Sequence, residues 1–368
     1  MAKGRRKAKK KREPTGRSPW PFALLFRLVL IIAAGALALS YLSVYINPSL
    51  IAFPLFFGLY FIPILIVNLA LLAVGMFRRS AASWITFIAI LPSLLFADMF
   101  VNWGEPGKGS EGLSLKIMTY NVGMFAHQKG VGRESALGSV ARFTGENNPD
   151  IICFQEFSIR DTAIIKTLFK EYPYRSSHFY RLRSGGRFGN ITMSKFPITE
   201  SGKITFKGST NLCIYSDVDH FGRMIRIYNT HLESHSISFT SLVKRISNSE
   251  KMSEELMDVH DKMANTFKRR SRQVDTIAAH SSASTLPAVI CGDFNDTPMS
   301  YTYHILSRGR KDSFRESGKG MSATYGSFWP MLRIDYILYP SDWWALGHTT
   351  PKVPWSDHYP VIAELLIP

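Results

Sequence analysis

The sequence predicts a mixed α/β domain preceded by an apolar, helical membrane region. Residues 20–101 are overwhelmingly apolar, whereas the chain from about residue 105 onward has the composition of an ordinary globular domain. In this later part, short apolar or alternating runs typical of strands are separated by helical patterns, as in α/β folds. With 368 residues, the chain is long enough for two such unlike units.

We expect four segments along the chain. They are a basic tail over residues 1–19, a membrane region over 20–102 with about three transmembrane helices, a linker over 103–113, and a globular domain over 114–368. The linker is rich in glycine and charged residues, which is typical of an irregular connection.

The N-terminal tail is strongly basic. Residues 1–17 hold nine Lys or Arg and one Glu, which accounts for half of the formal net charge of +16. Such a tail beside apolar segments attracts anionic lipid headgroups. Nucleic acid is the alternative, because the force depends on charge alone. We favour the membrane role, since the apolar segments follow directly.

Three apolar stretches are candidates for transmembrane helices: Phe22–Ile46, Leu50–Phe77 and Trp84–Val101. A helix needs about 20 apolar residues to cross a hydrocarbon core of about 30 Å. The first two stretches meet this length, whereas the third is shorter and marginal. Pro54, Pro63 and Asn68 in the second stretch indicate a kink packed against a neighbouring helix.

The charges around these stretches predict an orientation. Loops rich in Lys and Arg stay in the cytoplasm, which places the N-terminal tail and the Arg78–Arg79 pair there. The uncharged turn Asn47-Pro48-Ser49 suits the outer side. Three crossings make the chain an integral multi-pass protein of the cell membrane, with its globular domain on the non-cytoplasmic side. If the third stretch only lies in the interface, the domain is cytoplasmic instead.

The globular part contains eight runs with strand character. We expect strands over Leu115–Asn121, Ile151–Gln155, Gly189–Ser194, Asn211–Val218, Met224–His231, Ala288–Gly292, Ile334–Tyr339 and Val361–Ile367. The residues Asp219-His220-Phe221-Gly222 predict a hairpin turn. Helical patterns cover Glu134–Thr144 and about 241–280, and the basic run Lys268–Arg272 is expected on a solvated helix face.

The three cysteines, Cys153, Cys213 and Cys291, all lie in apolar, strand-like surroundings. An odd number at wide spacing predicts neither a disulfide framework nor a zinc site. We expect them to be buried and free.

Polar residues that can bind metal or transfer protons recur where the apolar runs stop. They are Asn121, Glu156, His231, Asp293, Asn295, Asp335, Asp357 and His358. Strand ends of a packed sheet converge on one rim, so residues far apart in sequence can form one pocket. Hard oxygen ligands select Mg²⁺ or Mn²⁺. A metal can polarise a phosphoryl oxygen, and a carboxylate can activate water. This inventory suits phosphoester hydrolysis.

Seven motifs in fixed order resemble the endonuclease/exonuclease/phosphatase superfamily over about residues 113–368. They are TYNV (119–122), the QE of ICFQEF (152–157), GNITMSKFPI (189–198), NTHLES (229–234), GDFND (292–296), RIDYIL (333–338) and SDHYPV (356–361). The resemblance implies a two-sheet α/β sandwich with helices on both outer faces. It also implies a metal-dependent hydrolase of the kind that includes nucleases, phosphatases and neutral sphingomyelinases.

The resemblance also implies a role for each residue that matches a motif. Glu156 is similar to the principal metal carboxylate, with Asn121 and Asp357 beside the metal. His231 matches the histidine at the scissile phosphate, and Asp293 matches the residue that aligns or deprotonates the attacking water. Asn295 matches a residue that hydrogen-bonds the phosphate. Asp335 and His358 match a coupled acid and imidazole, in which the imidazole is either a general base or a charged phosphate clamp.

Three neighbouring residues have competing interpretations. Asp296, followed by Thr297-Pro298, is expected to begin a turn or cap a helix and not to bind metal. Tyr325 and Trp329 lie in TYGSFWP and are candidates for stacking on substrate, with core packing as the alternative.

The expected substrate is a phosphoester, either in nucleic acid or in a phospholipid headgroup, and the expected bilayer partner follows from the apolar stretches. A sphingomyelinase-like headgroup hydrolase is one alternative function. Another is a tethered binding module that has lost catalysis, although none of the motif residues is missing. A transporter is disfavoured, because the spans hold no embedded pair of acids. The sequence indicates no particular protein partner.

Overall fold

The structure is a computed structural model that describes residues 20–104, 111–127, 130, 132–183, 185–234, 252–321, 323–326 and 332–368. The basic tail, the centre of the expected linker, the first part of the expected 241–280 helix and Trp329 lie outside these residues.

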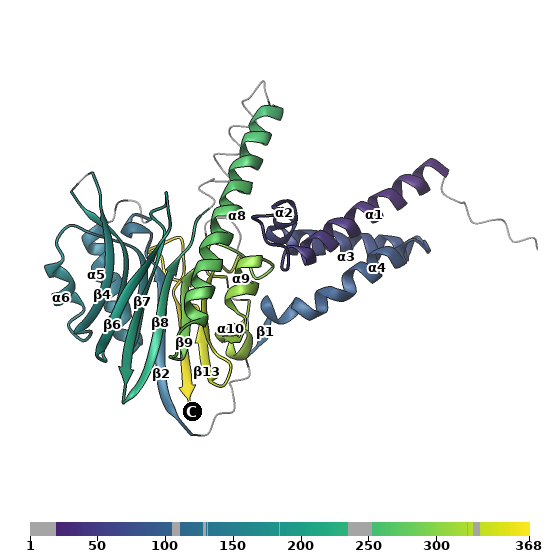
Figure 1. The fold of residues 1–368 in the computed structure, drawn as a ribbon. Coiled ribbons are helices and arrows are strands. Elements are labelled where there is room, and N and C mark those ends of the chain that lie inside the picture. Colours follow the sequence, from purple (N-terminus) through teal and green to yellow (C-terminus); the bar gives the residue numbers. More distant parts are fainter. Residues whose placement is uncertain are drawn as a thin grey trace, which may run out of the picture. The chain divides into compact units, whose positions relative to one another are not determined.

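Among the described residues the apolar helices come first, and strands with intervening helices follow (Figure 1). The helices are α1 (Trp20–Leu42), α2 (Phe53–Leu59), α3 (Phe61–Phe77), α4 (Ser83–Ile90), η1 (Leu91–Met99), η2 (Gly123–Phe125), α5 (Arg133–Asn147), α6 (Ala163–Leu168), α8 (Met252–Ser282), α9 (Tyr301–Leu306) and α10 (Ser313–Ser317). The strands are β1 (Asn102–Trp103), β2 (Leu113–Asn121), β3 (Ile151–Ile159), β4 (Tyr174–Arg181), β5 (Arg187–Ser194), β6 (Ile198–Thr205), β7 (Leu212–His220), β8 (Arg223–His231), β9 (Ala288–Asp293), β10 (Arg310–Asp312), β11 (Lys319–Gly320), β12 (Asp335–Pro340), β13 (Trp344–Thr349) and β14 (Val361–Ile367).

The chain divides into two compact units. The first unit consists of α1 up to Ala38 together with Ile62–Pro92. The second unit consists of Leu39–Phe61 and Ser93–Pro368. The expected boundary over residues 103–113 stays a prediction, and the second unit reaches further back along the chain than that boundary.

The apolar stretches differ in length and in regularity. Among the described residues, α1 is long and apolar enough to cross a membrane, and α2 with α3 would add a second span if this pair, bent by 74°, counts as one. The third stretch consists of the short α4 and the 3₁₀ helix η1, so three full crossings lack support from helix length. The expected kink is confirmed: α2 and α3 break at Tyr60, and Asn68 donates to the Ala33 carbonyl, 3.0 Å away.

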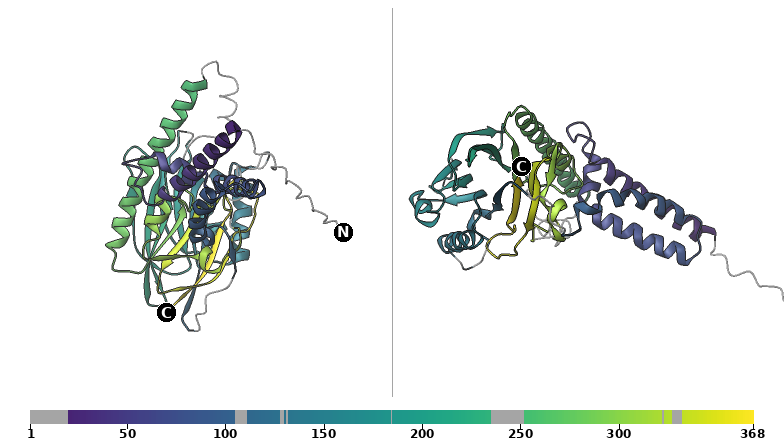
Figure 2. Two further views of the ribbon diagram at one scale, coloured as in Figure 1. Left: turned by 90° about the vertical axis from the view of Figure 1, so that its right-hand side faces the viewer. Right: turned by 90° about the horizontal axis from the view of Figure 1, so that it is seen from below.

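Two six-stranded sheets form the body of the second unit. Their strand orders are β10-β12-β9-β8-β7-β6 and β13-β14-β2-β3-β5-β4. Apolar side chains between them, including Ile117, Cys153, Ile227 and Cys291, form the central core. Figures 1 and 2 show the sheets as the central layers, and the predicted two-sheet sandwich is confirmed.

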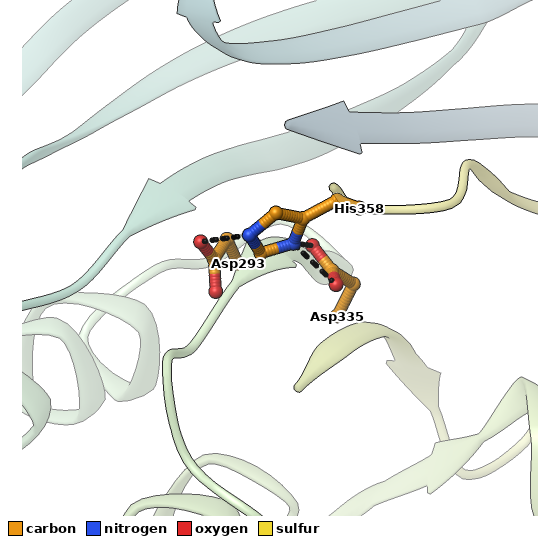
Figure 3. A group of neighbouring side chains, drawn as sticks. All are labelled: Asp293, Asp335 and His358. Atoms are coloured by element: carbon orange, nitrogen blue, oxygen red, sulfur yellow. Dashed lines mark hydrogen bonds and ion pairs between the residues drawn. The ribbon is translucent and has the colours of Figure 1, made fainter. Parts of the chain in front are cut away.

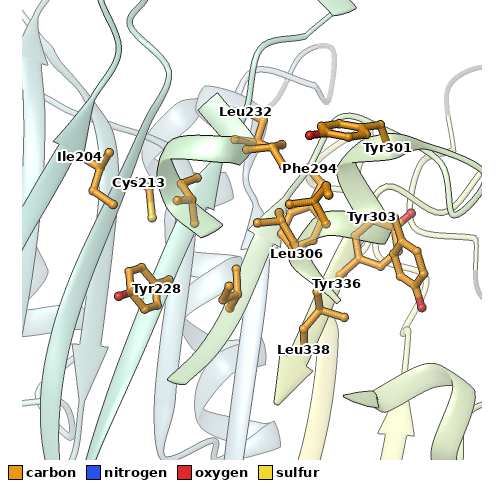
Figure 4. Packing of buried hydrophobic residues seen from close by; sticks show 14 of the residues in the cluster. Ile204, Cys213, Tyr228, Leu232, Phe294, Tyr301, Tyr303, Leu306, Tyr336 and Leu338 are labelled. Atoms are coloured by element: carbon orange, nitrogen blue, oxygen red, sulfur yellow. The ribbon is translucent and has the colours of Figure 1, made fainter. Parts of the chain in front are cut away.

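Helices cover both outer faces. Helices α5 and α6 pack on the β2 sheet through Leu137, Val140 and Ile165. On the other sheet, Phe267 and Val274 of α8 join Tyr303 of α9 in a second outer core. Figure 4 shows three aromatic members of this core side by side: Phe294, Tyr303 and Tyr336. The three cysteines are buried and free, as predicted.

All eight predicted strands are present, and they are the eight inner strands of the two sheets. The four outermost strands, β4, β6, β10 and β13, were not predicted. An inner strand is covered on both faces and is continuously apolar, whereas an edge strand is partly solvated and has a weaker pattern. The predicted hairpin turn is confirmed, and it is two residues shorter: His220 pairs with Arg223 across Phe221-Gly222.

Candidate active site

Three of the predicted site residues lie side by side across one sheet. His231 ends β8, Asp293 ends β9, and Asp335 begins β12. His231 is the register partner of Asp293, and Asp293 is the register partner of Asp335. Because β8 and β9 are parallel and β12 is antiparallel to β9, two strand ends and one strand start meet at the same edge.

The second sheet brings Asn121 and Glu156 to the same edge. The Asn121 side-chain nitrogen donates to Asp293 Oδ2 at 2.9 Å and to Glu156 Oε1 at 3.3 Å. Its oxygen accepts from the Gly123 nitrogen, 3.0 Å away, so the amide nitrogen faces the carboxylates. His231 Nε2 lies 3.5 Å from Glu156 Oε1. Residues of both sheets therefore share one cluster.

The Glu156 side chain points toward the cluster because β3 is locally irregular. The pairing of β3 with β5 shifts register between Phe154 and Phe157, and Glu156 there has a positive φ of 52°. A bulge of this kind turns a side chain away from the regular alternation. A left-handed backbone at a residue other than glycine is strained, and such strain gathers at functional sites.

The Asp293 loop is built with little spare room. Gly292 has a φ of 134°, and a Cβ there would lie 2.0 Å from the Thr230 carbonyl oxygen. Beyond it, the Asn295 backbone nitrogen donates to Asp293 Oδ1 at 2.8 Å, and the Asn295 amide donates to the Leu232 carbonyl at 2.9 Å. These bonds hold Asn295 beside Asp293 and beside the exit of β8.

His358 lies between two carboxylates (Figure 3). Its Nδ1 is 2.9 Å from Asp335 Oδ2, and its Nε2 is 3.7 Å from Asp293 Oδ2. Burial opposes charge on this imidazole, but the carboxylates of Asp335 and Asp293 outweigh burial and raise the pKa of His358 to about 10. Burial also raises the pKa of Asp335, an effect that His358 opposes and that Asp293 increases. The acid and imidazole expected to be coupled are thus in direct contact.

Asp357 and Tyr325 lie at the margin of the cluster. Asp357 is half-buried and accepts from the Ser356 hydroxyl at 3.3 Å, and its oxygen would lie 3.3 Å from a Cβ on Gly123. The Tyr325 ring lies against His358, with ring centroids 5.0 Å apart and an angle of 66° between the planes. The structure thus brings both residues next to the cluster.

The oxygen-rich cluster fits a hard divalent cation. Glu156 is the most open of the three acids beside the two imidazoles, with 26% of its side chain exposed against 1% for Asp293 and Asp335. Within the described residues, Asp293, Asp335 and His358 also hold donor atoms within 4.8 Å of one another. Figure 3 shows the imidazole between those two carboxylates, hydrogen-bonded to Asp335 and ion-paired with Asp293, and Glu156 offers oxygens for an ion.

Sequence reasoning missed a set of buried amides beneath the cluster. Gln155 donates to Asn229 Oδ1 at 2.9 Å, and Asn229 donates to the carbonyls of Phe154 and Ile191. Asn190 donates to the Asn229 carbonyl at 3.2 Å. These amides link the two sheets directly behind Glu156 and His231. Their positions inside the quoted motifs were the signal that could have found them.

Two hydroxyl groups also support the site without having been predicted. The Ser356 hydroxyl donates to the Asn121 carbonyl at 2.8 Å and accepts from the backbone nitrogen of His358 at 3.1 Å. Thr324 Oγ1, fully buried, accepts from the backbone nitrogens of Ile334 and Asp335. They fix the two ends of the Asp335–His358 pair.

Asp296 lies outside the carboxylate cluster, and its role differs from a helix cap. Ser300 caps α9, whereas Asp296 is buried and forms an ion pair with Arg270 at 3.0 Å. The expectation that Lys268–Arg272 lies on a solvated face is therefore wrong in part. Arg270 and Ser271 are buried: Arg270 pairs with Asp296 in the loop that follows Asp293, and the Ser271 hydroxyl lies 2.8 Å from the Ser49 hydroxyl.

Comparisons with known proteins bear on the family and the fold of this chain. The model of the Endonuclease/Exonuclease/phosphatase family matches residues 118–358, and a domain of unknown function (DUF8431) matches residues 23–98. No curated protein matches significantly.

Solved structures show the same fold. An endonuclease/exonuclease/phosphatase from Bacteroides vulgatus is 16% identical, with a TM-score of 0.51 over 70% of this chain and 100% of that one. One from Beutenbergia cavernae DSM 12333 is 18% identical, with a TM-score of 0.50 over 69% of this chain and 72% of that one. With the family model covering the whole set of strand-end residues, this chain belongs to the Endonuclease/Exonuclease/phosphatase family, whose members are hydrolases that act on phosphoester bonds.

Proposed function

We propose that this chain is a membrane-anchored phosphoesterase that uses Mg²⁺ or Mn²⁺ to hydrolyse a phosphodiester or phosphomonoester with activated water. The observation that carries the proposal is the continuous cluster at one edge of the sandwich. It runs from Glu156 through Asn121 and Asp293 to His358 and Asp335 by contacts of 2.9–3.7 Å.

Glu156 would hold the ion, with Asn121 and Asp357 beside it. When bound, the ion would polarise a phosphoryl oxygen and offset negative charge on the leaving oxygen. As placed, Asn121 donates to Glu156 and Asp293, so it orients the carboxylates through its nitrogen.

The other residues act on the phosphoester and on water. Asp293 aligns or deprotonates the attacking water, because its buried carboxylate is held by Asn121 and Asn295. His231 and Asn295 donate to the phosphoryl oxygens, and Tyr325 stacks on the group next to the phosphate. Asp335 orients His358 and favours its charged form, which suits a clamp on a phosphoryl oxygen.

The first test compares one carboxylate with an exposed control. In the purified full-length protein, Glu156→Gln should remove nearly all Mg²⁺- or Mn²⁺-dependent hydrolysis of DNA, RNA, sphingomyelin or a phosphoinositide. Glu200→Gln should retain it, because Glu200 is exposed on β6. Full activity in Glu156→Gln would refute the metal assignment, and no hydrolysis of any substrate by the unaltered protein would favour a binding module.

The substrate class can be separated by salt. Neutralising phosphates of a nucleic acid releases counterions, so binding weakens steeply as salt rises. We propose nucleic acid or a phospholipid headgroup as the substrate, and a flat salt dependence would favour the headgroup.

We also propose that the chain is a multi-pass membrane protein with the catalytic domain on the non-cytoplasmic side. Within the second unit, Asn47 of the uncharged turn donates to Tyr301 of the domain, and Asn102 donates to the Phe314 carbonyl. These contacts support a domain on the same side as the turn that follows α1.

Labelling on intact cells tests this orientation, since the native cysteines are buried. A membrane-impermeant maleimide should label Asp342→Cys on the domain without permeabilisation. It should label Ala81→Cys, beside the Arg78–Arg79 pair, only after permeabilisation. The reverse pattern would place the domain in the cytoplasm.

A further inference from the structure

The turn between the first two apolar stretches is packed into the catalytic domain. Ser43, fully buried just after α1, donates its hydroxyl to the Met299 carbonyl at 2.8 Å. Gly58 of α2 lies against the same carbonyl: a Cβ on Gly58 would be 2.3 Å from the Met299 oxygen and 2.1 Å from the Ser43 hydroxyl. This close approach leaves room for glycine only.

Polar contacts continue this docking along the turn. The Asn47 amide donates to the Tyr301 hydroxyl at 3.0 Å and to Asp275 at 3.2 Å, and Tyr301 donates to Asp275 at 2.7 Å. The hydroxyls of Ser49 and Ser271 are 2.8 Å apart. The turn thus contacts both α8 and α9.

Apolar contacts complete the docked surface. Leu55 is buried in the same core as Phe267, Phe294 and Leu306. Phe56 packs edge-on against Phe267, with ring centroids 5.1 Å apart. Phe294 lies between Asp293 and Asn295, so this core reaches the proposed catalytic loop itself (Figure 4).

Met299 belongs to the buried segment that leaves Asp293. Asp296 in this segment accepts from the Thr302 hydroxyl at 2.8 Å, and its carbonyl accepts from the Tyr336 hydroxyl at 2.9 Å. Arg270 of α8 pairs with Asp296 and donates to the Glu233 carbonyl at 2.7 Å. One arginine therefore ties the segment after Asp293 to the segment after His231.

We propose that the turn Ser43–Gly58 is a positioning element of the active site. By fixing Met299 and the neighbouring faces of α8 and α9, it keeps Asp293 and Asn295 in place against the exit of β8. The inference rests on the proposed catalytic roles of Asp293 and Asn295. The ordering of residues 293–303 by the turn does not depend on those roles. This turn is then part of the catalytic unit and more than a connection between two apolar stretches.

Amide hydrogen exchange on the full-length protein in detergent tests the ordering directly. Gly58→Ala should speed exchange in peptides that cover residues 293–306 by about tenfold, since the added methyl displaces the Met299 carbonyl. Gly35→Ala, where a Cβ meets nothing within 4 Å, should leave exchange unchanged. Gly75→Ala, whose Cβ would lie 2.3 Å from the Ser83 hydroxyl, creates a similar clash within the first unit and should also leave residues 293–306 unchanged.

A milder variant covers the case in which Gly58→Ala does not fold. Ser43→Ala removes the hydrogen bond to Met299 without adding volume, and it should speed exchange in the same peptides by several-fold. Unchanged exchange in the folded variants, or an equal rise in Gly75→Ala, would overturn the proposal.

Measuring kcat and KM separates a positioning role from general instability. Ser43→Ala should lower kcat about tenfold with little change in KM, because misplaced catalytic groups affect the transition state more than substrate binding. An unchanged kcat together with faster exchange would show that the ordering does not serve catalysis, and would overturn the positioning role. If the unaltered protein hydrolyses nothing, the proposed function fails. The exchange experiment still decides whether the turn Ser43–Gly58 orders residues 293–306.

Discussion

His358 Nδ1 lies 2.9 Å from Asp335 Oδ2, and this contact joins the loop before β14 in one sheet to the first residue of β12 in the other. The same imidazole approaches Asp293 with its second nitrogen at 3.7 Å. Both carboxylates favour the imidazolium, which is why the pKa of His358 is raised to about 10 despite burial. At neutral pH this arrangement keeps the imidazole charged, as the proposed phosphate clamp requires.

Asp335→Asn should therefore change the pH profile of hydrolysis. Without the carboxylate, the pKa of His358 should fall from about 10 toward its ordinary value of 6.5, so the imidazolium is lost between those values. If His358 acts as a clamp, only about 3% of the imidazole stays charged at pH 8 when its pKa is near 6.5, so activity there should drop by about 30-fold and recover in part at pH 6. Activity that instead rises with pH in the variant would favour a general base. Asp342→Asn, on an exposed loop, is the control.

Arg270→Met should destabilise the domain strongly. It leaves Asp296 buried without its partner, and breaking a buried ion pair by removing one member costs about 3–5 kcal/mol. Chemical unfolding of the full-length protein measures the loss. Arg272→Met, on the exposed side of the same helix, should change stability by less than about 0.5 kcal/mol. Equal effects in the two variants would contradict the structural role of Arg270.

Asn229→Leu should cost about 2–4 kcal/mol of unfolding free energy, since the buried carbonyls of Phe154 and Ile191 lose a donor and the Gln155 amide loses one of its acceptors. It should also reduce activity by displacing Glu156, the next residue after Gln155. Unfolding midpoints in denaturant measure the first effect. A variant as stable as the unaltered protein would show that these amides do not hold the sheets together.

The protein should lose stability in mild acid because of His348. This half-buried imidazole bonds the Ser313 hydroxyl at 2.9 Å, and burial lowers its pKa to about 4. Below pH 6.5 the unfolded chain binds a proton that the folded chain does not, so stability should fall as pH drops from 6.5 to 4. His348→Gln should weaken this dependence. Parallel curves of Tm against pH for the two proteins would rule out the assignment.

The inner part of the fold was predictable from the sequence because buried strands are short, continuous apolar runs. Leu115–Asn121 and Ala288–Gly292 are typical, and both correspond to inner strands. The edge strands β6 and β10 were missed, since ITESGKIT and RKD show no apolar run. The periodicity of an edge strand is diluted by its solvated side, so its position depends on the neighbour it pairs with.

The sequence by itself determined which chemical groups stand at the strand ends: Asp293, His231 and Glu156 each lie where an apolar run stops. Only the tertiary structure decided which of them touch. The approach of His358 to Asp293, the burial of Arg270 against Asp296 and the docking of Ser43 on Met299 join positions separated by up to 256 residues. Local periodicity reports the face of a single strand or helix, whereas these contacts depend on how two sheets and a returning helix pack, which no local pattern encodes.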